Sequence, residues 1–148
     1  MTVAAAVMHH YAAHGLPADG GEHDTWFRVH IGPFVIPLPN PPSRRNAVFL
    51  HDVNHVLTGY NTVSSDGEMS IAGVECGAGC GRVWIAWFIN LSLMIVGLVI
   101  RSRAVLRAFR RGRRTISLYA YPVERTVLRE MTVRELRHRL RIESGDTR

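Results

Sequence analysis

The distribution of apolar and polar positions divides the chain into an irregular N-terminal part and a helical remainder. Over residues 25–42 apolar residues alternate with other residues, and five prolines interrupt the alternation. Proline lacks a backbone N–H and is confined to sheet edges, so this stretch predicts an edge hairpin or an extended segment. From there to residue 142 apolar residues recur mainly at helical spacing, which predicts mostly helix.

Capping residues indicate where the first helices begin and end. Ser43 is a suitable N-cap after a proline pair, and Gly59 is a suitable terminator, so they bound the first helix. A second helix is predicted to begin near Gly67, where Ser65 and Glu68 have the spacing of a capping box. The C-terminal residues form an amphipathic pattern that predicts a last helix.

The most apolar stretch, residues 83–100, contains eighteen residues without a charge, and Arg82 and Arg101 bound it. It predicts one long hydrophobic helix that continues into the arginines that follow. Eighteen residues is the threshold for crossing a bilayer, and the basic cluster would then mark the cytoplasmic side. The alternative is a helix that packs in the core or lines a groove for a prenyl lipid.

We therefore predict an all-α fold with a Pro-rich extended N-terminal segment and one long hydrophobic helix. Residues 1–42 are expected to form an Ala/Gly/Pro-rich arm, residues 43–142 a compact helical domain, and residues 143–148 a flexible tail. A chain of 148 residues fits one domain with a modest core. A hydrophobic fraction of 47% with 20% charged residues excludes wholesale disorder.

The net charge of +6 comes from one segment. Residues 101–114 carry seven arginines and no acid, whereas the remainder is close to neutral. This segment is either a solvated helix end or a surface for anionic lipid headgroups. No nucleic-acid-binding motif accompanies it, so nucleic acid is not an expected partner. Two cysteines are too few for a disulfide scaffold, and the N-terminus does not resemble a secretory signal. We expect a cytoplasmic protein, peripheral to the inner face of the cell membrane.

The candidate chemistry is a metal site on the first predicted helix. His51 and His55 are four residues apart, so their imidazoles project from one helix face and can reach one cation. Asp52 lies about 100° round the helix and is a third ligand or an acceptor that orients a histidine. Glu68 can fold back over the pair from the next helix. These donors suit a divalent metal, with zinc as the default and iron or manganese as alternatives.

Other interpretations of the same residues stay open. A histidine pair at this spacing also occurs in cores and on surfaces without any metal, and Glu68 can serve only its capping box. Cys76 and Cys80 are also four residues apart and would complete a His₂Cys₂ zinc site. Free cysteines, however, are commonly just small buried hydrophobes.

The motif resembles the HDxxH…GE…E signature of the Coq-four family of ubiquinone-biosynthesis proteins. The residues that carry the resemblance are HDVNH (51–55), LTGY (57–60), GE (67–68), Glu75, RRGRR (110–114), SLY (117–119) and LRHRLRI (136–142). It spans roughly residues 43–142. Twelve residues separate His55 from Glu68 where the family usually has eleven. The chain is also shorter than is usual for the family.

The resemblance implies a mostly helical, membrane-associated protein that binds a divalent metal, usually zinc, through His51, Asp52, His55 and Glu68. It implies action at the step that removes the carboxyl group of a prenylated benzoate and oxidises that ring carbon. The metal would chelate the carboxylate and phenolate oxygens, while Asp52 or Glu75 moves a proton. Implied partners are a prenylated quinone precursor or similar lipid, an anionic membrane at Arg101–Arg114, other quinone-biosynthesis enzymes and a second copy of the chain. Two alternatives are a non-catalytic lipid-binding scaffold with a structural metal and a small single-pass membrane protein without a metal site.

Overall fold

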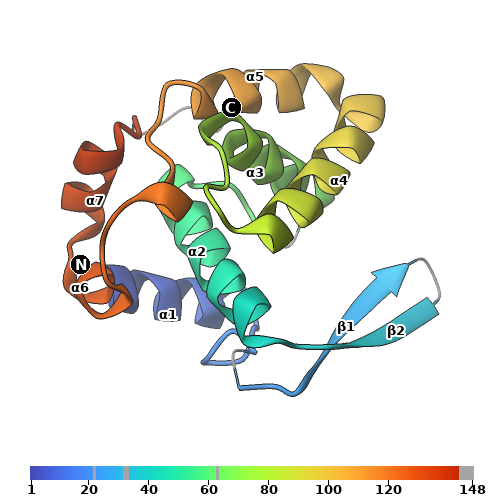
Figure 1. Ribbon diagram of the computed structural model, residues 1–148, viewed down its shortest axis with the longest axis horizontal. Coiled ribbons are helices and arrows are strands. Elements are labelled where there is room, and N and C mark those ends of the chain that lie inside the picture. Colours follow the sequence, from blue (N-terminus) through green and yellow to red (C-terminus); the bar gives the residue numbers. More distant parts are fainter. Residues whose placement is uncertain (22, 32–33, 63, 144–148) are drawn as a thin grey trace.

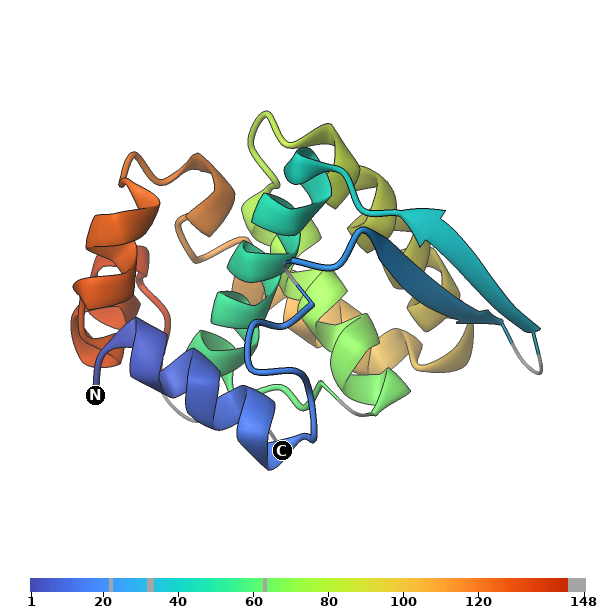
Figure 2. The same cartoon turned by 90° about the horizontal axis from the view of Figure 1, so that it is seen from below.

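Helices surround the central helix α2 in the computed structural model, which describes residues 1–21, 23–31, 34–62 and 64–143 (Figure 1). The elements are α1 (Val3–Ala13), β1 (Trp26–Ile31), β2 (Phe34–Pro39), α2 (Pro42–Thr58), α3 (Ser65–Ala78), α4 (Trp84–Ile100), α5 (Ser102–Gly112), the 3₁₀ turn η1 (Leu118–Ala120), α6 (Arg125–Glu130) and α7 (Val133–Leu140). One group of helices (α1, α6 and α7) lies on one side of α2, and another (α3, α4 and α5) lies on the other side (Figure 2). The prediction of a helical fold is confirmed.

The Pro-rich segment forms a two-stranded antiparallel hairpin. Trp26 lies opposite Pro39, and Ile31 lies opposite Phe34. The hairpin extends away from the helices and leads directly into α2 (Figure 1). This segment was predicted to be an edge hairpin or an extended segment, and the hairpin is what forms.

Helix α1, which lies in the predicted Ala/Gly/Pro-rich arm of residues 1–42, belongs to the main hydrophobic core. Val3 and Val7 are buried against residues of α2, α6 and α7, including Val53 and Leu136. The backbone N–H of Val3 also donates to the carbonyl of Met131 at 2.8 Å. Apolar burial therefore holds α1 against α6 and α7. Of the predicted tail, only Glu143 lies within the described residues.

Backbone contacts join α3 to α5 on the other side of the molecule. A Cβ atom added to Gly112 would lie 2.1 Å from the carbonyl oxygen of Val74, and one added to Gly77 would lie 2.3 Å from that of Phe109. No larger residue fits at these two positions without moving a helix. The same pair of helices is close at Gly73, where an added Cβ atom would lie 3.0 Å from the carbonyl oxygen of Val105.

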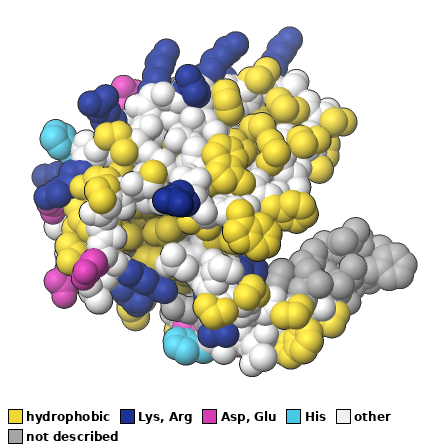
Figure 3. Space-filling model, viewed as in Figure 1, with side chains coloured by type: hydrophobic (Ala, Val, Ile, Leu, Met, Phe, Trp, Pro, Cys, Tyr) yellow, Lys and Arg dark blue, Asp and Glu magenta, His cyan; other side chains and the backbone are white. Residues whose placement is uncertain are grey.

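The predicted long hydrophobic helix is not formed. The chain breaks at Arg101 (φ −136°, ψ 44°), so the apolar helix α4 ends at Ile100 after 17 residues and α5 begins a separate segment. Among the described helices, none combines the length and the apolarity that crossing a bilayer requires. Helix α4 is not packed inside the core either, since only Ala86, Asn90 and Gly97 are buried. Apolar side chains gather on the surface over α4 (Figure 3).

Candidate metal centre

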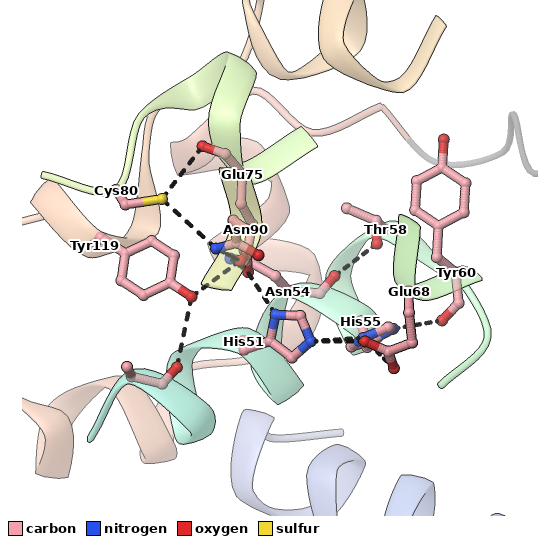
Figure 4. Close-up of polar contacts among 11 residues, drawn as sticks. His51, Asn54, His55, Thr58, Tyr60, Glu68, Glu75, Cys80, Asn90 and Tyr119 are labelled. Carbon is pink, nitrogen blue, oxygen red and sulfur yellow. Dashed lines mark hydrogen bonds and ion pairs between the residues drawn. The ribbon is translucent and has the colours of Figure 1, made fainter. Parts of the chain in front are cut away.

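Helices α2 and α3 bring His51, His55 and Glu68 together. The two histidines lie one turn apart on the face of α2 that is turned toward α3 (Figure 4). Glu68 follows in the first turns of α3, whose N-cap is Ser64 and not the predicted Ser65. The hydroxyl of Ser64 accepts from the backbone N–H of Gly67 at 3.1 Å. The predicted capping box is therefore absent, and the carboxylate of Glu68 points at the histidines instead.

The three side chains converge at distances that suit a metal ion. His51 Nε2 lies 3.1 Å from His55 Nε2 and 3.2 Å from Glu68 Oε2, and His55 Nε2 lies 3.3 Å from Glu68 Oε1. Ligand atoms at bond lengths near 2.1 Å on a tetrahedron are separated by about 3.4 Å. These residues form a group that could hold a metal ion, as the sequence predicted for His51, His55 and Glu68.

Both imidazoles turn a lone pair toward this centre. His55 Nδ1 lies 2.9 Å from the backbone carbonyl of Tyr60, which can only accept, so Nδ1 carries the proton. His51 Nδ1 lies 3.1 Å from the carboxylate of Glu75 and donates to it in the same way. In the neutral rings the Nε2 atoms are therefore both acceptors. Two lone pairs and a carboxylate at this range repel one another unless a cation or a proton lies between them.

The electrostatics of the centre favour a positive charge there. Burial would lower the pKa of His51, but the carboxylates of Glu75 and Glu68 outweigh it and raise that pKa well above its usual 6.5. Burial would raise the pKa of Glu68, yet its contacts with His51 and His55 lower it to about 2. Without a metal, a proton on His51 satisfies the site. A divalent cation has to displace that proton.

A glycine-dependent contact positions the loop that holds His55. A Cβ atom on Gly67 would lie 1.8 Å from the carbonyl oxygen of Asn61, so only glycine lets this loop lie against the start of α3. Gly59 ends α2 in the left-handed conformation (φ 79°), as predicted, and turns the chain into the same loop. The loop in turn places the carbonyl of Tyr60 at His55. Gly67 thus serves the packing of the loop on α3, and Glu68 belongs to the group that could hold a metal ion.

Glu75 orients His51 from inside the protein. Its side chain is 1% exposed. Besides His51, three donors reach its carboxylate: Asn54 Nδ2 at 2.7 Å, Asn90 Nδ2 at 2.5 Å and the Tyr119 hydroxyl at 3.0 Å. A carboxylate on the far nitrogen of a histidine fixes the tautomer and direction of the ring, and Glu75 is placed to do this for His51. The predicted role of Glu75 in moving a proton stays a prediction.

Asp52 does not join the cluster, contrary to the prediction that it is a metal ligand. It follows His51 by one position, and its Oδ2 accepts a 2.6 Å hydrogen bond from the hydroxyl of Tyr11 on α1. Burial raises the pKa of Asp52, while the Tyr11 bond and the two histidines partly oppose that effect. Asp52 therefore ties α1 to α2 beside the metal centre. Its predicted role in moving a proton stays a prediction.

The cysteines do not complete a His₂Cys₂ site in the part of the chain that the structure describes. Cys76 and Cys80 are both buried and free. Cys80 Sγ lies 3.6 Å from Asn90 Nδ2 and belongs to the network behind Glu75. Burial raises the pKa of Cys80 to about 12, so its thiol stays protonated and is a poor metal ligand.

Several polar groups around the site were not assigned from the sequence. Asn54 lies inside the HDVNH motif and Tyr119 inside the SLY motif, but neither position alone indicates a contact with Glu75. Asn90 is an amide within the uncharged run, which was a usable signal because a buried amide requires partners. His10 of α1 stacks on His55 with ring centroids 5.9 Å apart, and its Nε2 meets the hydroxyl of Thr62.

Comparison of the chain with protein-family models, with characterised proteins and with solved structures found no match. The resemblance to the Coq-four family is carried by the motif residues alone.

Proposed function

We propose that His51, His55 and Glu68 bind one divalent metal, with zinc as the default, in a protein of quinone biosynthesis. The observation that carries this proposal is the convergence of two imidazole lone pairs and a carboxylate within 3.1–3.3 Å of one another. Iron or manganese would accept the same donors. The resemblance of the surrounding motif to the Coq-four family supports the choice of pathway.

The substrate class that we propose is a prenylated aromatic acid. The side chains of His51 and Glu68 are 19% and 27% exposed, so the centre is reachable from solvent. Three protein ligands with an open side are typical of catalytic metal sites, in which the metal polarises an oxygen of the substrate. Loss of the ring carboxylate as CO₂ leaves an electron pair on the ring carbon, which takes up a proton. Oxidation of that carbon would follow with a separate oxidant.

We place this activity at the cytoplasmic side of the cell membrane, where substrates with lipid tails reside. The arginines of residues 101–114 supply positive charge for anionic headgroups. Other quinone-biosynthesis enzymes and a second copy of the chain stay proposed partners.

A non-catalytic lipid-binding scaffold with a structural metal is the second candidate. It is favoured by the buried network that joins α2, α3 and α4 through Glu75, Asn54 and Asn90. A metal ion next to this network would stabilise the packing of α2 against α3. Turnover of a prenylated benzoate by the metal-loaded protein separates the two functions, because a scaffold binds the lipid without converting it.

Metal analysis of purified protein tests the shared claim. We expect about one equivalent of metal per chain in the wild type and loss of it in His55→Ala and in Glu68→Gln. His138→Ala, on the exposed side of α7, is the matched control and should retain the metal. Glu68→Gln keeps the shape of a partly exposed side chain, so it separates lost coordination from lost folding. Stoichiometric metal in either site variant would refute the centre.

A further inference from the structure

Helix α4 exposes large apolar side chains along its whole length. Its exposed residues are Trp84 (69%), Trp87 (38%), Phe88 (66%), Leu91 (44%), Ile95 (56%), Val96 (50%), Val99 (84%) and Ile100 (62%). In the space-filling view these yield a broad apolar surface over α4 (Figure 3). Isolated exposed apolar residues are normal on soluble proteins, but a continuous patch of this kind indicates a surface that something covers.

The exposed residues follow the helical period and so form one face. Trp84, Phe88, Leu91, Ile95 and Val99 recur at intervals of three and four residues. Ala86, Asn90 and Gly97 form the buried face. A helix on the surface of a soluble domain would carry charged residues on its outer face. Ser92 is polar, but its hydroxyl donates to the carbonyl of Phe88 at 2.8 Å and is satisfied within the helix.

Arginines border this apolar face on the side of α5. Arg103, Arg107 and Arg110 are exposed and lie at i, i+4 and i+7, so they form one row along α5. Leu106, 43% exposed, lies among them. In Figure 3 basic side chains project along the upper edge, where α5 lies, next to the apolar surface over α4. The segment contains no acid that could neutralise the row, although Asp66 of α3 pairs with Arg101 at 3.2 Å.

We propose that α4 lies flat in the surface of an anionic phospholipid membrane. Its apolar face would enter the boundary between headgroups and acyl chains, to a depth of about 5–10 Å, while the α5 arginines contact lipid phosphates. At about 1.5 Å per residue the helix is roughly 25 Å long, which suits an orientation parallel to the membrane plane. Trp84 and Trp87 have the amphipathic rings that favour this interface.

The charge pattern favours a lipid membrane as the partner that covers the apolar face of α4. An apolar surface together with a polybasic row is the pair of features that holds a protein at an anionic membrane. A second copy of the chain would cover the apolar face but would bring another arginine row and no new cluster of acids to balance it. An anionic membrane covers the apolar face of α4 and also neutralises the arginine row of α5.

Membrane binding through α4 would also set the position of the metal centre relative to the membrane. The buried face of α4 supplies Asn90, which donates to Glu75, and Glu75 accepts from His51. One helix thus contacts the lipid on one face and the network of the metal site on the other. The inference specifies the surface behind the membrane location proposed above. It does not depend on the metal, because the exposed face contains no ligand.

Binding of the full chain to large unilamellar vesicles tests the proposal. We expect co-sedimentation with vesicles of phosphatidylcholine and phosphatidylglycerol, and weaker binding to phosphatidylcholine alone. Raising the salt to about 1 M should weaken the electrostatic part, because the Debye length falls to about 3 Å. Phe88→Asp should weaken binding about tenfold, since it replaces an inserted aromatic side chain by a charge. Val127→Asp, at a 49% exposed position of α6, should bind as the wild type does.

The arginine row is tested with the triple variant Arg103→Gln, Arg107→Gln and Arg110→Gln. About 1 kcal/mol per basic residue corresponds to about a hundredfold weaker binding to anionic vesicles. Arg134→Gln, on the exposed side of α7, is the control that should change nothing. Metal content should remain that of the wild type in all these variants, so failure here is distinguishable from failure of the metal centre.

Two results would overturn the proposal. One is equal vesicle binding by Phe88→Asp and Val127→Asp. The other is a wild-type protein that ignores anionic vesicles but forms a dimer in sedimentation velocity, with the dimer lost in Phe88→Asp. That outcome would assign the α4 face to a second copy of the chain.

Discussion

The two sides of α2 are built from opposite chemistry. Toward α1, α6 and α7 the helix presents Val53 and Leu57, which are buried with Leu128 and Leu136 in the main core. Toward α3 and α4 it presents His51, Asn54 and His55 to a set of buried polar partners. The apolar side stabilises the fold mainly through burial, to which the hydrogen bond from Tyr11 to Asp52 adds. The polar side holds fixed geometry and negative charge, which either a proton on His51 or a bound metal ion can balance.

The largest expected effect, on the free energy of unfolding, comes from a substitution in the apolar core on the α7 side of α2. Leu136→Ala should lower the free energy of unfolding by about 2–5 kcal/mol, because it opens a cavity at a fully buried position. The metal affinity of the folded protein should stay unchanged, since no side chain of the polar network moves. Urea unfolding measures the first quantity and chelator competition the second. Leu106→Ala, at an exposed position, is the control for stability.

Adding metal should stabilise the protein through the polar side. Zinc at about 100 times its dissociation constant should raise the free energy of unfolding by about 2.7 kcal/mol. In Glu68→Gln this gain should disappear at the same zinc concentration, whereas His138→Ala should keep it. Urea titrations with and without zinc measure the difference. A zinc gain of the same size in Glu68→Gln would show that the ion binds elsewhere.

Changing Glu75, which accepts a hydrogen bond from His51, should have a smaller effect. Glu75→Gln should weaken zinc binding about 10–100-fold, because the amide is a poorer acceptor for His51 Nδ1 and does not increase the basicity of the ring. The exposed Glu135→Gln serves as its control. Unchanged affinity in Glu75→Gln would mean that the buried network does not orient His51.

The smallest effect concerns pH. As the pH rises, the stability of the metal-free protein should fall, whereas its affinity for zinc should rise. The pKa of His51 is raised above 6.5 in the folded state, so its charged form stabilises the metal-free protein most fully below pH 6.5. That contribution is lost as the pH rises through the raised pKa. Zinc affinity should rise over the same range, because binding displaces the proton. Unfolding and zinc titrations across this range test both slopes, and parallel slopes would contradict the site.

Local sequence signals were sufficient for the parts of the site that lie on one helix or at its ends. The spacing of His51 and His55 fixed their common face, and Gly59 marked the end of α2. Glu68 was predicted as a ligand, yet Ser64 caps the helix in place of Ser65. Residues 64 and 65 are both serine, so the sequence does not indicate which of them caps the helix. The conformation of the folded loop decides it.

The contacts that the sequence did not reveal join segments far apart in the chain. Asn90, Tyr119 and Tyr11 reach the site from α4, η1 and α1, and no local period indicates which buried polar group will meet which. The position of α4 was missed for another reason. Its run is apolar on all sides, so the pattern contains no face that distinguishes the core from the surface.

Anomalous X-ray diffraction from crystals of the zinc-loaded protein, measured at the zinc edge, tests the metal centre most directly. We predict one strong peak about 2.0–2.2 Å from His51 Nε2, from His55 Nε2 and from a carboxylate oxygen of Glu68. A peak at other residues, or rings that turn apart with no peak between them, would contradict the metal centre.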